Sequence, residues 1–197
     1  VLLVEGAAEL ILLPALVKEM MEIDLEHHGV SVVSINGTHF SPFMKLFSDG
    51  KLGKRCAVLG DADLPAPSHD EDDESAIEPR EELQKLSSPS VRVFLGRTTF
   101  ERELADLENA KMIVAAVASA GLQRASQRLR AMADEALKLP PGDPRRNFLE
   151  EDFRSATLRA AVRIGKARFA QRCAAAVKDG LVIPEYISEA VDWLTAK

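Results

Sequence analysis

The chain has 197 residues, of which 46% are hydrophobic and 28% are charged, and its formal net charge is −6. This composition excludes a disordered chain and is sufficient for one good hydrophobic core, or one core with a smaller satellite domain. No apolar run approaches the roughly 20 residues of a membrane-spanning helix, and no signal-peptide pattern is present. Two cysteines, Cys56 and Cys173, are too few for a disulfide scaffold, so we expect a cytoplasmic protein with reduced cysteines and no membrane partner.

Four short apolar runs have the pattern of buried strands in a parallel sheet. They are residues 1–4, 30–35, 56–59 and 91–95. Helical patterns separate the first three runs: one from about 7 to 27 that includes Pro14 and ends at Gly29, and one that includes Pro42 and Phe47. The resulting β-α-β-α-β order predicts a parallel sheet with right-handed crossovers.

From Glu101 onward the sequence shows no strand pattern. Helices are predicted over residues 110–137, 147–178 and 184–195, with a break rich in proline and glycine at 139–144. We therefore expect an α/β fold in which helices flank a parallel sheet, with an additional all-α subdomain. The chain starts at Val1 inside a core strand and without a methionine, so we also expect an N-terminal region to precede it.

Acidic side chains gather where the predicted strands end. They are Glu5 and Glu9 after the first strand, Asp61 and Asp63 after the third, and Glu101 and Glu103 after the fourth. Ligands of open α/β sheets bind at the carboxyl ends of the strands, and carboxylate oxygens are the hard ligands typical of Mg²⁺. In extended backbone, residues two apart point the same way, so Asp61 and Asp63 can reach one ion.

Each of these acids also has a structural interpretation. The pattern D-x-D is common in surface turns, where both acids are solvated, and Glu9 would complement the dipole of its helix. Thr98 or Thr99 would cap a helix, and Glu101 or Glu103 would complete a capping box with it. In a regular helix, side chains two positions apart diverge by about 200°, so these two glutamates would then not face one site.

Charge is divided unevenly along the chain. Residues 1–110 carry 10 Lys and Arg against 21 Asp and Glu, whereas residues 111–197 carry 15 against 10. An acidic first part that binds metal ions, joined to a basic second part, would suit a phosphate-rich substrate. Eight of the acids lie in the loop at 69–82, however, and this loop alone explains much of the asymmetry.

A basic stretch in the C-terminal part contains Arg159, Arg163 and Lys166, which are spaced to share one helix face. Arg159, Arg163 and Arg168 are candidates for contacts with DNA backbone phosphates, although a solvated basic face explains them equally well. Gly165 is unusual inside a helix because glycine costs about 1 kcal/mol there, and we expect it to mark the close approach of another backbone.

These segments resemble a known family. Glu5-Gly6 after the first strand and Asp61-x-Asp63 after the third resemble the Toprim fold shared by topoisomerases, primases and recombination nucleases. The wider similarity is to the C-terminal region of OLD-family nucleases, and the segments TFEREL and GKARFAQ favour that family over other Toprim proteins. The segments that carry this similarity are LLVEGAAELILLPAL (2–16), GVSVVSINGTHFSPFMKLF (29–47), CAVLGDAD (56–63), TTFEREL (98–104) and GKARFAQ (165–171).

The resemblance implies a metal-dependent endonuclease that cleaves DNA phosphodiester bonds with two Mg²⁺ ions, for which Mn²⁺ would substitute. The implied metal ligands are Glu5, Glu9, Asp61, Asp63, Glu101 and Glu103. Lys166 and Glu5 are the implied catalytic residues, with Lys166 neutralising charge on the phosphorus. Where the family pattern often has E-x-D, this chain has Glu101-Arg102-Glu103, which keeps a carboxylate but lengthens its reach.

The resemblance also implies an organisation. Residues 1–108 would form a Toprim-like catalytic domain, and residues 109–197 a helical domain that contributes to the active site. An ABC-type ATPase domain would precede them in the same polypeptide, homo-oligomers would form through that region, and DNA would be the substrate. Two other functions remain open: a metal-dependent phosphohydrolase with Asp61 as nucleophile, and a non-catalytic module for DNA binding or dimerisation.

Overall fold

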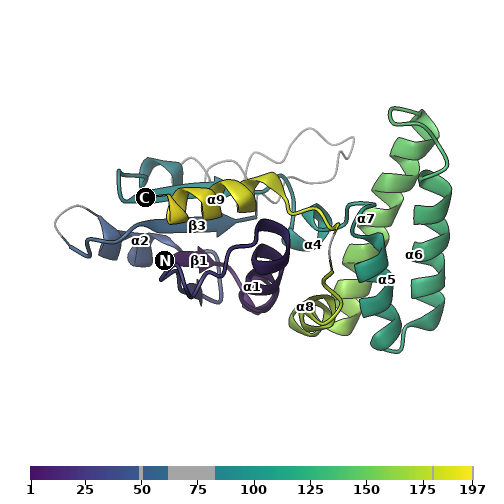
Figure 1. The fold of residues 1–197 in the computed structure, drawn as a ribbon, viewed down its shortest axis with the longest axis horizontal. Helices are drawn as coiled ribbons and strands as arrows, with labels where there is room; N and C mark the ends of the chain where they lie inside the picture. Colours follow the sequence, from purple (N-terminus) through teal and green to yellow (C-terminus); the bar gives the residue numbers. More distant parts are fainter. Residues whose placement is uncertain (49–50, 62–82, 179, 197) are drawn as a thin grey trace.

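A computed structural model of the chain describes residues 1–48, 51–61, 83–178 and 180–196. In these residues, four parallel strands form one sheet in the order β2-β1-β3-β4 (Figure 1). The strands are β1 (Leu2–Val4), β2 (Val32–Ser34), β3 (Cys56–Gly60) and β4 (Val91–Leu95). All four predicted strands are confirmed, with bounds that differ by at most two residues from those expected.

The strands place alternate side chains on the two faces of the sheet, so the protein has three layers. One face packs against α1 (Ala7–Met21) and α9 (Glu185–Thr195) through the buried side chains Leu2, Val4, Ala57 and Leu59. The other face packs against α2 (Ser41–Phe47) and presents Leu3, Cys56, Val58 and Val91. The near-continuous apolar runs of the sequence thus reflect strands covered on both sides.

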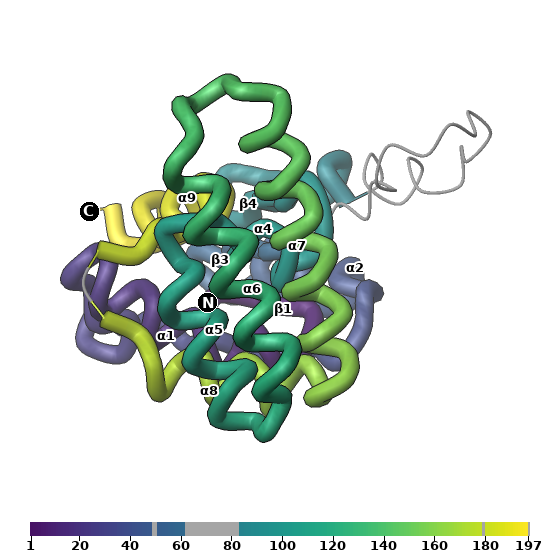
Figure 2. The backbone as a smooth tube through the Cα atoms, turned by 90° about the vertical axis from the view of Figure 1, so that its right-hand side faces the viewer, coloured from purple at the N-terminus to yellow at the C-terminus, as the bar shows by residue number. Residues whose placement is uncertain are grey.

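The remaining helices lie beyond the carboxyl ends of the strands. They are α4 (Phe100–Glu103), α5 (Ala110–Ser119), α6 (Gln123–Ala136), α7 (Pro144–Ile164) and α8 (Lys166–Ala174). Helix α6 packs against α5 and α7 at the end of the molecule far from the sheet. Helix α8 packs against α1 and α5 (Figures 1 and 2). Helix α8 therefore joins the helical part to the sheet layers.

The predicted single helices over 110–137 and 147–178 are wrong, because each is divided in two. Gly121 separates α5 from α6 with a φ of 87°, and Gly165 separates α7 from α8 with a φ of 93°. A positive φ cannot continue a right-handed helix, and glycine adopts it without steric cost. The expected close approach at Gly165 is also wrong, because a Cβ atom built there meets nothing within 4 Å.

The predicted helix over 7–27 is too long. Helix α1 continues through Pro14 but ends at Met21, and Glu22 follows in the left-handed conformation with a φ of 56°. Asp24 then begins a turn by accepting hydrogen bonds from the backbone N–H groups of Glu26 (3.2 Å) and His27 (3.3 Å). Such local hydrogen bonds compete with helix formation, which explains the early end.

Helix α9 confirms the last predicted helix and returns to the sheet, where it packs on β3 and β4 (Figure 1). Its Trp193 ring lies 6.2 Å from the ring of Phe94 and receives the guanidinium groups of Arg55 and Arg92 at 5.8 and 5.1 Å. The division into domains at 1–108 and 109–197 stays a prediction. Among the described residues, no helix combines the length and the apolar character needed to cross a membrane.

Candidate metal centre

The carboxyl ends of β1 and β3 bring Glu5 and Asp61 into contact. Oε1 of Glu5 accepts a hydrogen bond of 2.8 Å from the backbone N–H of Asp61. A Cβ atom at Gly60 would lie 3.0 Å from a methyl carbon of Leu95, which favours glycine there, and at an ordinary contact distance of 3.6 Å from Oε1 of Glu5. The predicted convergence of acids from neighbouring strand ends is thus present for this pair.

Asp61 lies in a strongly negative environment. Burial raises the pKa of its carboxyl group to about 8, and the charges of Glu5 and Glu9 act in the same direction, while a hydrogen bond with the Phe100 backbone opposes them. A carboxyl group surrounded in this way is stabilised either by a proton or by a cation. At neutral pH without a bound cation, the proton is favoured.

Glu9 belongs to the same cluster and is buried at the start of α1. Burial raises its pKa and the charge of Glu101 adds to this effect, whereas hydrogen bonds with the Glu9 and Gly6 backbone and the charge of Lys166 lower it. The backbone bonds are what the structural interpretation of Glu9 predicts for a helix N-terminus. They do not outweigh burial, so the pKa of Glu9 stays above its usual value.

Glu101 and Lys166 join α4 to α8 at the centre of the cluster. Oε2 of Glu101 lies 3.0 Å from Nζ of Lys166, and the two side chains are 2% and 48% exposed. The ammonium group of Lys166 compensates the charge of this buried oxygen, which accepts no other hydrogen bond from the described residues. Burial lowers the pKa of Lys166, but Glu101, Asp61 and Glu9 outweigh burial and raise it. The ammonium group is therefore a cation among carboxylates.

Glu103 has a different environment. Its Oε1 accepts hydrogen bonds from the backbone N–H groups of Arg97 (3.1 Å) and Thr98 (2.8 Å), and from the hydroxyl of Thr98 (2.9 Å). Glu103 therefore holds the loop after β4 in place. This arrangement resembles the predicted capping box, except that the N-cap residue Thr99 makes no side-chain hydrogen bond. Glu101 and Glu103 point apart, as two positions on a helix should.

The donor set fits a divalent cation in its chemistry. Within the part of the chain that the structure describes, four carboxylates lie near enough to affect one another's ionisation: Glu5, Glu9, Asp61 and Glu101. The buried oxygen of Glu101, which accepts no other hydrogen bond from the described residues beside its contact with Lys166, is the atom that such an ion would satisfy. In residues 1–48, 51–61, 83–178 and 180–196, no three His, Cys, Asp or Glu side chains are grouped closely enough to hold an ion. Asp63 lies outside the described residues.

Tyr186, on α9, packs against the hydrophobic core, as the sequence predicts, and also lies near the acids. Its ring lies over Gly96, where a built Cβ atom would be 3.2 Å from two ring carbons. Burial raises its pKa well above the usual value, and the charges of Asp61 and Glu103 contribute next. The one sequence signal is a glycine directly after the carboxyl end of β4, where another group can approach closely.

Comparison with known proteins agrees with this geometry. Residues 1–63 match the family "Overcoming lysogenization defect protein-like, TOPRIM domain". The structure is similar to the C-terminal region of the Burkholderia pseudomallei OLD protein, with a TM-score of 0.67 and 26% identity over 98% of this chain and 94% of that one. Residues 1–63 thus match the OLD-like Toprim family, and the fold as a whole is similar to the C-terminal regions of OLD proteins. No curated protein matches the chain.

Two structures of another OLD protein show the same similarity. The C-terminal region of the Xanthomonas campestris pv. campestris OLD protein, phased with iodine, has a TM-score of 0.57 and 26% identity over 98% of this chain and 92% of that one. The structure phased with platinum has a TM-score of 0.56 and 25% identity, over 98% and 90%. The similarity to OLD C-terminal regions therefore extends over the sheet and the helices together.

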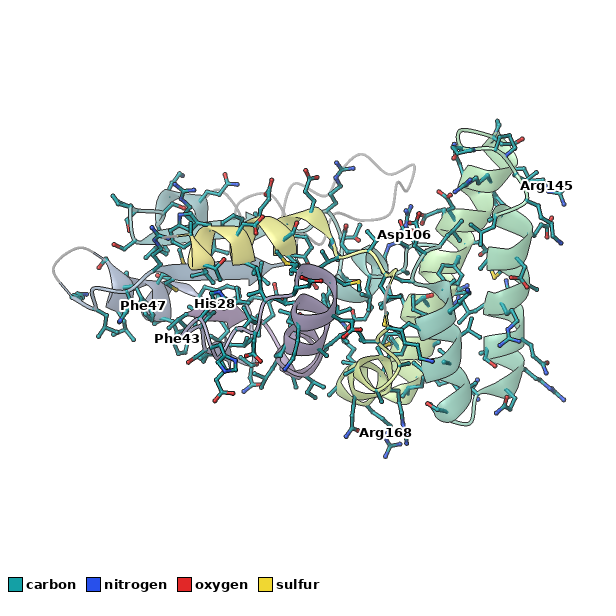
Figure 3. All side chains as sticks on the ribbon, in the orientation of Figure 1. His28, Phe43, Phe47, Asp106, Arg145 and Arg168 are labelled. Atoms are coloured by element: carbon teal, nitrogen blue, oxygen red, sulfur yellow. The ribbon has the colours of Figure 1, made fainter. Side chains whose placement is uncertain are left out.

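The candidate DNA contacts are exposed side chains outside the buried cluster of acids. Arg159, Arg163 and Arg168 are exposed, and Arg159 pairs with Asp152 at 4.0 Å. Arg168 points into solvent away from the rest of the molecule (Figure 3). The predicted common face of Arg159, Arg163 and Lys166 is wrong, because Gly165 ends α7 and places Lys166 on a different helix.

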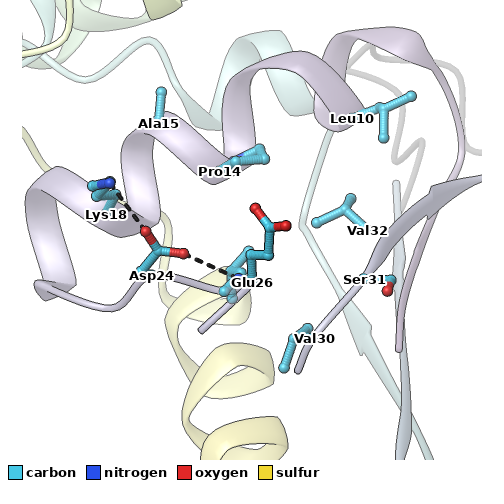
Figure 4. Close-up of a pocket in the computed structure, with 10 residues that line it drawn as sticks. Leu10, Pro14, Ala15, Lys18, Asp24, Glu26, Val30, Ser31 and Val32 are labelled. Carbon is cyan, nitrogen blue, oxygen red and sulfur yellow. Dashed lines mark hydrogen bonds and ion pairs between the residues drawn. The ribbon is translucent and has the colours of Figure 1, made fainter. Parts of the chain in front are cut away.

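A shallow pocket of about 560 Å³ lies elsewhere, between α1 and the edge strand β2 (Figure 4). Its lining includes Leu10, Pro14 and Val32, with the ion pair of Lys18 and Asp24 at one side (3.0 Å). None of the predicted metal ligands or catalytic residues is among the residues that line it. We therefore place the candidate site at the strand ends and not in this pocket.

Proposed function

We propose that this chain is a metal-dependent endonuclease of the OLD family that hydrolyses DNA phosphodiester bonds with two Mg²⁺ ions, for which Mn²⁺ can substitute. The observation that carries the proposal is the buried oxygen of Glu101, which faces Lys166 in a cluster with Glu9 and Asp61 and accepts no other hydrogen bond from the described residues. Toprim domains generally bind divalent metal ions, and the OLD-like Toprim family is nuclease-related.

The carboxylates that would hold the ions come from the ends of β1 and β3 and from helices α1 and α4. Glu5, Glu9, Asp61 and Glu101 are the described candidates, with Asp63 and Glu103 completing the proposed set. Bound Mg²⁺ supplies charge neutralisation at the phosphate and a more acidic water molecule. Glu5 also orients the backbone at Asp61 through the 2.8 Å hydrogen bond, which fixes where that side chain begins.

Lys166 would act on the phosphate from α8, beside the carboxylate of Glu101. Its ammonium group lies at the start of α8 and is half exposed, so it can exchange Glu101 for a phosphate oxygen without crossing the core. A lysine kept charged by its acidic neighbours donates hydrogen bonds to the negative charge that develops on the phosphate. We assign Lys166 and Glu5 as the catalytic residues on this basis.

DNA and a preceding domain complete the proposal. Exposed Arg159, Arg163 and Arg168 would contact backbone phosphates, which position DNA without reading its sequence. The similar solved structures are C-terminal regions of OLD proteins, which supports an N-terminal ABC-type ATPase domain as the partner in the same polypeptide. Homo-oligomers would then form through that domain.

Plasmid nicking with and without Mg²⁺ or Mn²⁺ tests the proposal. We expect Asp61→Asn to abolish nicking, while its thermal unfolding stays as sharp as that of the unmodified chain. Asp134→Asn, an exposed substitution on α6, is the matched control and should cleave normally. Nicking that survives in Asp61→Asn, or that needs no metal, would contradict the assignment.

The same variants separate the other functions. A phosphohydrolase that uses Asp61 as nucleophile would form a covalent phosphoaspartate, which intact-protein mass spectrometry of an acid-quenched reaction detects. The pKa of about 8 for Asp61 does not favour this role, because the nucleophile must be ionised. A non-catalytic module would bind DNA in a gel-shift assay but leave plasmid intact with either metal.

A further inference from the structure

We propose that exposed arginines of α6 and α7 together form a surface that binds the phosphate backbone of duplex DNA. This surface, called the arginine stripe below, consists of Arg124 and Arg128 on α6 and Arg159 and Arg163 on α7. The inference rests on the proposed function and extends it, because it adds α6 to the DNA contacts and requires a double strand.

Helices α6 and α7 pack against each other and run in opposite directions. Near their connection, Glu135 of α6 pairs with Arg145 of α7, which Figure 3 labels at that end of the molecule. Farther from the connection, Arg128 of α6 pairs with Asp152 of α7 at 3.5 Å. Arg124 is one turn before Arg128, so it lies one turn nearer the end of α7. The arginines of the two helices therefore gather at the end away from the connection.

One carboxylate links the arginines of the two helices. Asp152 pairs with Arg128 at 3.5 Å through one oxygen and with Arg159 at 4.0 Å through the other. The two arginine side chains are 64% and 62% exposed, so both guanidinium groups remain open to a ligand. Within the described residues, neither Arg124 nor Arg163 forms an ion pair, and both are exposed. The stripe therefore keeps an excess of positive charge.

The spacing of these arginines works against helix stability. Arg124 and Arg128 are one turn apart, and so are Arg159 and Arg163. Like charges at this spacing repel each other and destabilise the helix that carries them. A ligand with regularly spaced negative charges would relieve the repulsion, which favours a binding role over a merely solvated face.

The stripe leads toward the proposed metal centre. Arg163 precedes Lys166 by three peptide units of 3.8 Å each, so their Cα atoms lie within about 11 Å of each other. From Asp152 to Arg163, α7 advances about 16 Å at 1.5 Å per residue. DNA whose scissile phosphate reaches Lys166 would therefore meet the stripe through phosphates on one side of the cut.

The chemistry of the stripe selects the backbone of a double strand. A guanidinium group binds phosphate through two parallel N–H donors. Surfaces for single strands add aromatic side chains on which bases stack, and protein interfaces are also enriched in aromatic residues. The exposed large apolar side chain beside the stripe is Val162, whereas Phe148, the exposed aromatic residue of α7, lies toward the connection with α6. A row of guanidinium groups on two packed helices fits a regular backbone instead.

Fluorescence anisotropy of a labelled duplex in EDTA tests the stripe without metal or cleavage. The double variant Arg124→Gln, Arg128→Gln should bind the duplex about tenfold more weakly. Its plot of log affinity against log salt should be shallower by about 1.8, because each lost phosphate contact removes about 0.9. The matched control, Arg130→Gln with Lys138→Gln, removes the same charge at exposed positions outside the stripe. It should bind within about threefold of the unmodified chain, since Arg130 is turned by about 200° from Arg128.

Asp152→Asn should change duplex binding in the opposite direction. Asparagine removes the negative charge that pairs with Arg128 and Arg159, so the duplex should bind about two- to fivefold more tightly. Asp134→Asn, exposed on α6 and outside the stripe, changes the net charge equally and should have a smaller effect. Duplex binding by Asp152→Asn that is no tighter than that of Asp134→Asn would contradict the proposal.

Three results would refute the stripe. One is equal duplex binding by the double arginine variant and its control. Another is tighter binding of a single strand of the same length than of the duplex. The third is a chain that binds an aspartate-rich peptide and no duplex, which would indicate an acidic protein partner.

The failure of the stripe and the failure of the proposed function are distinguishable. If the unmodified chain nicks plasmid with Mg²⁺ but the double arginine variant binds duplex normally, the stripe is refuted and the proposed function stands. If the variants bind duplex as expected but the unmodified chain nicks no plasmid with either metal, the endonuclease is refuted and the DNA-binding surface stands.

Discussion

Nζ of Lys166 lies 3.0 Å from Oε2 of Glu101, so the proposed catalytic ammonium group pairs with a proposed metal ligand. Glu101 is almost fully buried, and a buried carboxylate requires a compensating charge. Lys166 supplies this charge. The lysine and a divalent ion would therefore compete for the same oxygen, which leads to a prediction that separates metal binding from catalysis.

Lys166→Met should bind Mn²⁺ at least threefold more tightly, measured by calorimetry, while losing DNA cleavage. Removal of the competing cation leaves Glu101 to the metal, but removes the group proposed to act on the phosphate. Without metal the variant should lose roughly 1 kcal/mol of unfolding free energy, near the low end for a buried group left unpaired, since Lys166 is half exposed. Lys178→Met, exposed and outside the cluster, is the control. Equal or weaker Mn²⁺ binding by Lys166→Met would refute the competition.

The sequence predicts the sheet and the approximate place of the site because both depend on local patterns. Apolar runs of four to six residues mark strands such as β3, and the parallel order brings Glu5 and Asp61 to one edge. The break at Gly165 is less visible, because helix-compatible residues flank it on both sides, and only the observed φ of 93° shows that the glycine ends α7. Tyr186 carries no local pattern, since it reaches the site only through the tertiary packing of α9 on the sheet.

Stability should fall as pH rises in the absence of metal. The pKa of Asp61 is about 8 in the folded chain against an ordinary value of 3.8, so the folded state binds this proton more tightly than the unfolded state does. The stabilisation is complete below about pH 4 and is lost as pH rises through 8, with a slope of up to about 1.4 kcal/mol per pH unit. Urea unfolding in EDTA at pH 5, 6, 7 and 8 measures this slope.

The comparison that tests this pH dependence is Asp61→Asn, which removes the titrating group and should flatten most of the slope. A smaller slope should remain, because burial also raises the pKa of Glu9. With Mn²⁺ present, affinity should increase from pH 6 to pH 8, since ligands must lose their protons to bind metal. An unmodified chain whose stability rises over pH 5–8 without metal would contradict the environment described for Asp61.

Gly165→Ala should be destabilising and should also disturb the site. Alanine at a φ of 93° is strained by about 1–3 kcal/mol, and no neighbouring atom adds to this cost because the space around it is open. Relief of the strain would turn the start of α8 and move Lys166. We expect reduced DNA cleavage together with a lower urea midpoint.

Gly142→Ala provides the control for backbone strain alone. Gly142 has a φ of 86° in the connection between α6 and α7, with open space around it and no link to the acids. Its alanine variant should lose similar stability and keep its cleavage rate. If both variants cleave DNA equally, the break at Gly165 has no role in placing Lys166.

Arg102 should stabilise the chain more than a surface arginine does, because it ties α4 to α7 beside Glu101. Its side chain is only 11% exposed, pairs with Glu151 and donates a 3.0 Å hydrogen bond to Oγ of Ser155. Arg102→Met keeps the apolar stem and should lose roughly 1–2 kcal/mol of unfolding free energy in urea. Arg145→Met removes an ion pair with Glu135 at a side chain that is 71% exposed and should cost under about 1 kcal/mol. Of these two ion pairs, the pair of Arg102 with Glu151 is the one that holds α4. Arg102→Met should therefore also weaken Mn²⁺ binding, whereas Arg145→Met should not. Equal effects of the two variants on Mn²⁺ binding would show that the link between α4 and α7 does not support the metal centre.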